Sequence, residues 1–228
     1  MLIALILPPR IPLWVVVIGS AFAIAIIKEA FGGLGHNIFN PALAARAFLA
    51  VTFAAMMTNW ISPVSDFVNM DSVTTATPLS EGFSYVGSKT DLYMDLFLGN
   101  TGGCIGETSA LLVLIGGLIL LFFGVIKWKI PVIYIGTVFF LTWIIPGQDP
   151  VFHILAGGLF LGAFFMATDY VTAPMTAKGQ YIFAFGAGVL VVMIRLYGSM
   201  PEGVAFSILL MNAFTPLIDR YVLSLIHI

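Results

Sequence analysis

The sequence has little charge and almost no cysteine. Asp, Glu, Lys and Arg make up 9% of its 228 residues, against about 25% in soluble proteins. A single cysteine, Cys104, cannot form an internal disulfide or an all-cysteine metal site. A net charge of -2 leaves no basic surface of the kind that nucleic acid requires. These scarcities exclude an ordinary soluble domain and a disulfide scaffold, and we expect no nucleic-acid partner.

Apolar residues fill the space that charge leaves. They make up 60% of the chain, and the mean hydropathy is +1.07. A membrane-spanning helix needs about 20 largely apolar residues. We therefore expect an all-α, polytopic membrane protein embedded in the lipid bilayer. Seven segments meet or approach the required length: Ile11–Phe31, Asn40–Asn59, Glu107–Lys127, Ile130–Pro146, Pro150–Thr168, Gln180–Tyr197 and Gly203–Ile218.

A short motif occurs twice in the chain. Asn37-Ile-Phe-Asn-Pro41 recurs as Asn212-Ala-Phe-Thr-Pro216, and an arginine follows each copy, at Arg46 and Arg220. Three matching positions in five are also compatible with chance. If both copies lie on the fifth helix of a repeat, three helices precede Ile11, and two five-helix repeats are inverted in the membrane.

This repeat sets the expected organisation of the chain. Met1–Leu7 lacks the basic flank, full apolar core and cleavage site of a signal peptide, so we interpret it as the end of a membrane helix that starts upstream. The last six residues, from Leu223, resemble a translated sequencing adapter. We expect the end of a truncated first repeat at 1–58, a loop at 59–106, a second five-helix repeat at 107–222, and an artefact at 223–228.

The longest weakly apolar region contains one concentrated polar stretch, Met70–Ser80. By composition alone it is a solvated loop with serine and threonine turns. Its order, however, matches the flavinylation signature Asp-x-x-(Ser/Thr)-(Gly/Ser)-Ala-Thr at Asp71, Thr74, Ala76 and Thr77, and departs from it only at Thr75. The last threonine of that signature is esterified to the phosphate of FMN. We therefore predict that Thr77 carries covalent FMN.

The chemistry of such a bond requires a partner protein. A threonine hydroxyl is a poor nucleophile until a base or metal activates it, so a flavin transferase is expected to attach the FMN. Pro78 biases Thr77 towards an extended backbone, which would present the hydroxyl outward.

The distribution of basic residues predicts the orientation in the membrane. Cytoplasmic loops carry an excess of Lys and Arg. If the Thr77 loop is placed outside, three basic residues (Arg10, Lys89 and Arg195) fall outside and six fall inside: Lys28, Arg46, Lys127, Lys129, Lys178 and Arg220. We expect the Thr77 loop on the extracytoplasmic side of the membrane.

Four stretches together resemble one family of membrane proteins. They are Gly32–Phe48, which begins with the sequence Gly-Gly-Leu-Gly-His-Asn-Ile-Phe-Asn-Pro, the flavinylation motif, Gly102–Ser109 and Met211–Arg220. Their order is similar to that of the RnfD and NqrB family, membrane subunits of ion-pumping electron-transfer complexes. The resemblance implies a ten-helix, inverted-repeat fold similar to urea transporters, of which about seven helices are present here.

The resemblance also implies a function. It implies a membrane subunit of the Rnf complex, which pumps Na+ or H+ while electrons pass between ferredoxin and NAD+. The chain would carry FMN, with riboflavin as a further candidate, bind the other Rnf subunits and be inactive alone. The ending of the chain favours RnfD over NqrB, and an NqrB-like subunit remains the alternative. A urea-channel-like transporter is the rival from another class, and a structural subunit that has lost its cofactor is a third.

Three further residues have weaker expectations. Arg46 lies early in an apolar helix, where an arginine costs about 2.5–3.5 kcal/mol, so we expect a partner or a flavin-binding role. Glu107 either stabilises a helix N-terminus or lines an ion pathway. Cys104 alone cannot hold an iron–sulfur cluster, although it could supply one ligand at an interface.

Overall fold

The computed structural model describes residues 1–58, 60–61, 74–75, 78–79, 87–198 and 203–223. Asp71, Ala76 and Thr77 lie outside the described residues, so the predictions made for them stay predictions. The elements are α1 (Leu2–Leu5), α2 (Leu13–Ala21), η1 (Phe22–Glu29), α3 (Pro41–Thr52), α4 (Ala54–Met57), β1 (Trp60–Ile61), β2 (Thr74–Thr75), α5 (Lys89–Leu98), α6 (Ala110–Phe122), α7 (Lys129–Ile144), α8 (Pro150–Leu155), α9 (Leu159–Leu161), η2 (Gly162–Met166), α10 (Ala177–Tyr197) and α11 (Gly203–Leu223).

Each of the seven segments predicted to span the membrane contains helix, and this helical architecture is consistent with a membrane protein. In the described part of the chain, one helix, α10, is both long and apolar enough to cross a membrane without interruption. Helices α3, α6 and α7 are apolar but shorter. The segment Pro150–Thr168 is interrupted between α8 and α9. Helix α11 is as long as α10 but contains Asn212, Asp219 and Arg220.

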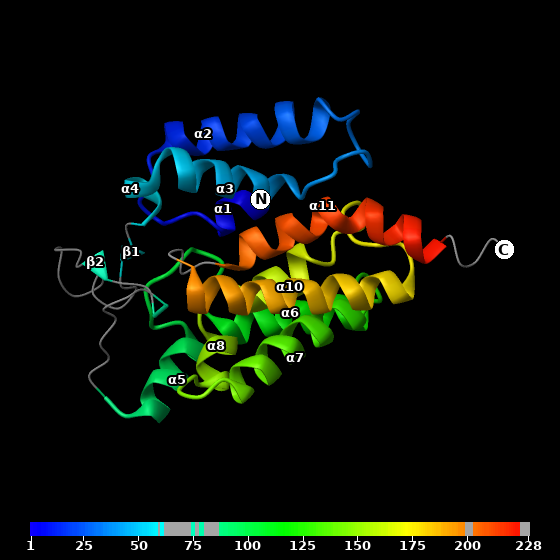
Figure 1. Ribbon diagram of the computed structural model, residues 1–228. Coiled ribbons are helices and arrows are strands. Elements are labelled where there is room, and N and C mark those ends of the chain that lie inside the picture. The colour runs from blue at the N-terminus through cyan, green and yellow to red at the C-terminus, as the bar shows by residue number, and fades with distance from the viewer. Residues whose placement is uncertain (59, 62–73, 76–77, 80–86, 199–202, 224–228) are drawn as a thin grey trace.

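Helices α7, α10 and α11 form the centre of the bundle (Figure 1). Small residues allow them to approach closely, as is typical of helices packed in lipid. A Cβ atom on Gly188 of α10 would lie 2.6 Å from the Cβ of Thr137 on α7. Tyr134 and Phe183 are fully buried in the same core, and the Tyr134 hydroxyl is hydrogen-bonded to Ser207 of α11 at 2.8 Å.

Two helices, α5 and α6, differ from the sequence prediction. Helix α5 lies inside the region predicted as a loop, and it begins with a capping box between Ser88 and Asp91. Helix α6 begins at Ala110 with Ser109 as its N-cap, so Glu107 precedes the helix instead of starting it. In both cases a Ser side chain that accepts a backbone N–H determines the first turn.

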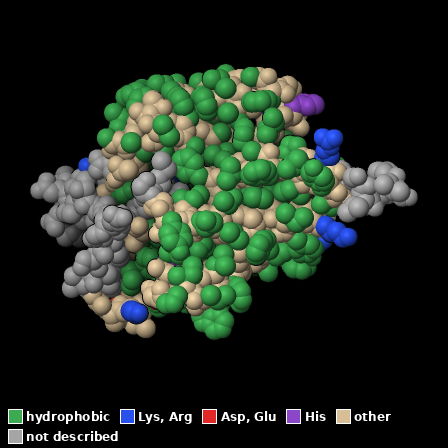
Figure 2. Space-filling view, viewed as in Figure 1, with side chains coloured by type: hydrophobic (Ala, Val, Ile, Leu, Met, Phe, Trp, Pro, Cys, Tyr) green, Lys and Arg blue, Asp and Glu red, His purple; other side chains and the backbone are tan. Residues whose placement is uncertain are grey.

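The outer surface and the two ends of the bundle differ in chemistry. In the view of Figure 2, hydrophobic side chains cover the side of the bundle, and the visible Lys and Arg side chains lie towards its ends. Strands β1 and β2, which pair antiparallel, lie at one end with α5, while η1 and α11 finish towards the other (Figure 1). Strands β1 and β2 and helix α5 therefore lie at the end opposite to the starts of α7 and α10, which carry Lys129 and Lys178.

The two copies of the repeated motif lie side by side but differ in local structure. Pro41 is the first residue of α3, whereas Pro216 lies inside α11. With its amide oriented to satisfy both groups, Asn212 accepts the Asn40 N–H at 3.2 Å and donates to the Ile208 carbonyl at 3.3 Å. The inverted repeat inferred from this motif remains a prediction.

Candidate functional site

Leu79 follows Thr77 by two residues and is described in the structure. Its side chain is held at a break between two helices. Helix α8 ends at Leu155, and α9 begins at Leu159. Between them Gly157 has a φ of +66°, a left-handed conformation that favours glycine. A Cβ on Gly157 would lie 2.7 Å from Leu79 Cδ1 and 3.1 Å from Arg195 Nη2. The absence of a side chain at Gly157 therefore makes room for Leu79.

Arg195 stabilises the same break through its guanidinium group. Its guanidinium donates hydrogen bonds to the carbonyl oxygens of His153 and Ala156, the latter at 3.0 Å. These carbonyls belong to the last turn of α8 and to the residue that follows it. Backbone oxygens at the C-terminal end of a helix have no N–H donor within the helix. Arg195 thus caps the C-terminal end of α8.

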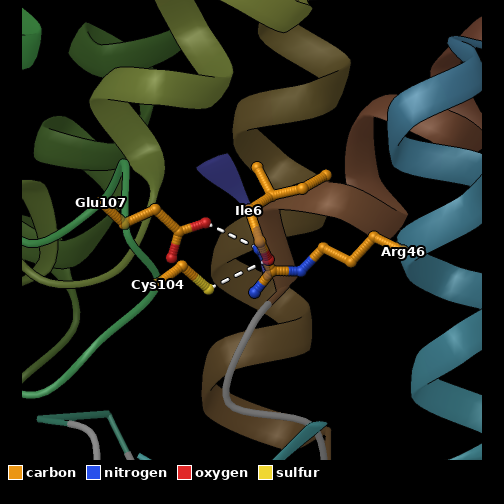
Figure 3. A network of polar contacts seen from close by, with 4 residues as sticks. All are labelled: Ile6, Arg46, Cys104 and Glu107. Carbon is orange, nitrogen blue, oxygen red and sulfur yellow. Dashed lines mark hydrogen bonds and ion pairs between the residues drawn. The ribbon is translucent and has the colours of Figure 1, made fainter. Parts of the chain in front are cut away.

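A buried ion pair near this break joins the two halves of the chain (Figure 3). Arg46 Nη1 lies 2.8 Å from Glu107 Oε1 and donates to the Ile6 carbonyl at 2.6 Å. The two side chains are only 6% and 11% exposed. The Cys104 thiol donates to the same Ile6 carbonyl at 3.1 Å. Desolvation raises the pKa of this thiol, and the nearby Glu107 raises it further, so the sulfur stays protonated.

The two arginines meet at one small cavity. A space of about 20 Å³ is lined by Arg46, Glu107, Leu79, Gly157 and Arg195. Such a volume admits about one water molecule, so no flavin ring or phosphate fits inside it. The charged groups that line it with Leu79 are the guanidiniums of Arg46 and Arg195 and the carboxylate of Glu107.

The arrangement corrects the orientation argument at two residues. Arg46 was placed inside and Arg195 outside, but both line this one cavity, so neither reports on a membrane side. Arg46 has the partner that its position required, Glu107. Nothing in the structure tests its expected flavin-binding role.

Comparison with known proteins identifies the family. Residues 1–225 match the NQR2, RnfD, RnfE family. The chain belongs to this family. It is 53% identical over 97% of its length to the D subunit of a proton-translocating ferredoxin:NAD(+) oxidoreductase complex from Clostridium ljungdahlii, and it covers 70% of that protein. It is 51% identical over 96% of its length to the D subunit of the Na(+)-translocating complex of Acetobacterium woodii, of which it covers 68%.

A subunit of the NqrB type is also similar to this chain. The B subunit of the Na(+)-translocating NADH-quinone reductase of Ectopseudomonas mendocina is 42% identical over 98% of this chain, which covers 58% of that protein. The higher identity to the two D subunits above agrees with the preference for RnfD that the sequence ending indicated.

Several members of the site could not be found from sequence. Arg195 lies in an apolar run like many membrane-helix residues, and Ile6 contributes only its backbone carbonyl. Leu79 is one apolar residue among many. The available signal was the pair Gly157-Gly158 inside an apolar segment, because adjacent glycines can mark a break and a close approach. A Cβ on Gly158 would lie 2.5 Å from Glu107 Oε1.

Proposed function

We propose that the chain is the RnfD membrane component of an ion-translocating ferredoxin:NAD+ oxidoreductase, with covalent FMN on Thr77. The carrying observation is its identity of 51% and 53% to the D subunits of two such complexes. The chain acts in electron transfer as one subunit of a redox-driven translocase, alongside the other Rnf subunits. It spans the bacterial inner membrane several times as part of a ten-helix, inverted-repeat fold, with the Thr77 loop on the extracytoplasmic side.

The ends of the bundle support this orientation. Without Arg46 and Arg195, the loop side retains Arg10 and Lys89, while Lys28, Lys127, Lys129, Lys178 and Arg220 remain for the other side. The excess of basic residues therefore still favours the cytoplasm for the end away from the loop.

The seat of Leu79 supports a flavin role for the loop. Leu79 follows Thr77 by two residues in the sequence, and its side chain lines a cavity together with the charged side chains of Arg46, Glu107 and Arg195. Charge near a flavin is one of the means by which a protein tunes the electronics of the cofactor. The bound FMN supplies the electron-transfer chemistry, while the chain positions it and tunes its potential.

Riboflavin, the further flavin candidate, fits best in an open groove at another part of the bundle. The groove has a volume of about 510 Å³ and is lined by Lys28, Asn37, Asn40 and Phe165. This volume lies within the range of about 300–1,000 Å³ that small-molecule sites occupy. The Lys28 ammonium can hydrogen-bond a ring carbonyl or a ribityl hydroxyl, and the phenylalanine offers apolar surface.

The test of covalent flavin is direct. The full chain is co-expressed with a flavin transferase, and flavin fluorescence is read on a denaturing gel. Wild type should fluoresce, and Thr77→Ala should not. Thr75→Ser, which restores the usual residue of the motif, serves as the control and should keep the signal. Equal fluorescence in wild type and Thr77→Ala would refute the attachment site and favour a transporter or a subunit without cofactor.

A further inference from the structure

A second pocket lies between the starts of α7 and α10. Its volume is about 220 Å³, and its lining includes Lys127, Tyr170 and Gln180. The two helices begin beside each other, since Lys129 Nζ lies 5.7 Å from the centre of the Tyr181 ring. None of the lining residues belongs to the cavity beneath Leu79 or to the groove assigned to riboflavin.

The start of α7 attracts negative charge. The helix has 16 residues and no side chain that caps its N-terminus. Its first N–H groups therefore lack an acceptor from the helix, and the helix dipole gives this end a partial positive charge. Lys127 lines the pocket, and Lys129 is the first residue of α7. The carboxylate of Asp219 is already engaged by the Met175 N–H at 3.2 Å.

Gln180 supplies an independent indication of a ligand. The residue is only 6% exposed. Its Nε2 donates to the Pro174 carbonyl at 3.1 Å, but its Oε1 is buried without a hydrogen-bond partner among the residues that the structure describes. A buried acceptor without a donor is unfavourable. A hydroxyl group on a bound molecule would satisfy it.

The surroundings indicate a membrane interface. Trp128 is 56% exposed, Tyr170 72% and Tyr181 42%. Tryptophan and tyrosine gather where the hydrocarbon of a bilayer meets the headgroups. Basic pockets between membrane helices on the cytoplasmic side are suited to anionic lipid headgroups.

We propose that this pocket binds the headgroup of an anionic phospholipid of the phosphatidylglycerol type. The phosphate lies against Lys127 and the uncapped first turn of α7. The terminal glycerol of the headgroup donates a hydroxyl hydrogen bond to Gln180 Oε1. The acyl chains lie along the apolar surface beside Trp128 and Tyr170.

The first experiment compares two charge reversals on the same face. The full chain in detergent is titrated with phosphatidylglycerol, and bound lipid is counted by native mass spectrometry. Lys127→Glu should weaken binding by at least about ten-fold, because it removes a basic residue worth about 1 kcal/mol, or about five-fold, and also adds a carboxylate that repels the phosphate. Lys178→Glu makes the same change of net charge at an exposed residue that does not line the pocket, and it should weaken binding less than about three-fold. Equal losses in the two variants would overturn the site, because they would show attraction by the whole face.

The second experiment separates the parts of the ligand. Phosphatidylpropanol has the same phosphate but no headgroup hydroxyl, so wild type should bind it more weakly than phosphatidylglycerol. Gln180→Met should lose this preference while still binding both lipids. Phosphatidylcholine and soluble sn-glycerol 3-phosphate should bind poorly. Wild-type binding of both anionic lipids with equal strength would refute the role of Gln180, and equally tight binding of sn-glycerol 3-phosphate would show a free phosphate ligand. Loss of lipid binding only when another protein of the complex is present would assign the face to that protein.

Discussion

Arg46 and Arg195 line one cavity, yet the structure accommodates them by different means. Arg46 is held by a carboxylate and the Ile6 carbonyl, whereas Arg195 is held by the carbonyls that end α8. The first arrangement joins distant parts of the chain through opposite charges. The second uses a charge to complete a local backbone feature. A buried arginine can therefore be stabilised by a carboxylate or by backbone carbonyls, and loss of the arginine should cost different amounts of unfolding free energy in the two cases.

The largest effect should follow removal of Arg46. Arg46→Ala leaves Glu107 buried without its partner, and breaking a buried pair costs about 3–5 kcal/mol. We expect this loss in the free energy of unfolding, measured in detergent. The double variant Arg46→Ala with Glu107→Ala should be more stable than the single one. A double variant as unstable as the sum of two singles would show that the pair is not coupled.

A smaller effect should follow removal of Arg195. Arg195→Ala removes two charge-assisted hydrogen bonds to carbonyls, but it leaves no opposite charge stranded and water can solvate the freed carbonyls, so we expect a net cost of about 1.5–3 kcal/mol. We expect a loss of unfolding free energy below that of Arg46→Ala. Hydrogen exchange should rise first in the last turn of α8, and uniform exchange across the bundle would contradict the capping role.

Substitution of Leu79 tests whether its contact with Gly157 and Arg195 holds the loop in place. Leu79→Ala should leave the amount of covalent FMN unchanged, because the proposed attachment residue, Thr77, is still present. The fluorescence anisotropy of that flavin should fall, since its tether is no longer held at Gly157. Leu79→Met, of similar volume, is the control and should keep the wild-type anisotropy. An unchanged value in Leu79→Ala would remove the anchor from the proposal.

The smallest effect concerns the other end of α8, where Asp149 is the N-cap and accepts a hydrogen bond from Tyr93. Desolvation raises the pKa of Asp149, but the Tyr93 hydroxyl, two backbone N–H groups and Lys89 outweigh it and hold this pKa below its usual 3.8. The depressed pKa means that the cap stabilises the fold above about pH 4 and that this contribution is lost as the pH falls further.

Tyr93→Phe should therefore lower stability at pH 7 by about 1 kcal/mol or less, given the exposure of the pair. The difference from wild type should shrink when unfolding is measured at about pH 3. A difference that persists at low pH would show that the ring, and not the hydrogen bond, is responsible.

Local features of the fold were predictable, and the site was largely not. Asn40-Pro41 and Asp149-Pro150 each place an N-cap residue before a proline, a pattern that predicts a helix start, and Asn40 and Asp149 do cap α3 and α8. The break at Gly157 was missed because apolar sequence continues on both sides of it. Glu107 was expected near a helix start, but its partner Arg46 is 61 residues away in the chain. Such contacts depend on how helices pack, which local pattern does not encode.

The contact of Leu79 with Gly157 and Arg195 has a consequence for the order of biosynthesis. Translation produces the loop first, and the two residues that receive Leu79 are made 78 and 116 residues later. If the loop crosses the membrane as proposed, it does so before its docking place has been made. In that interval a transferase could reach the proposed attachment residue, Thr77, without any unfolding of the finished protein. Docking of Leu79 is then one of the last steps of maturation, because it requires that the second half of the chain has already been inserted.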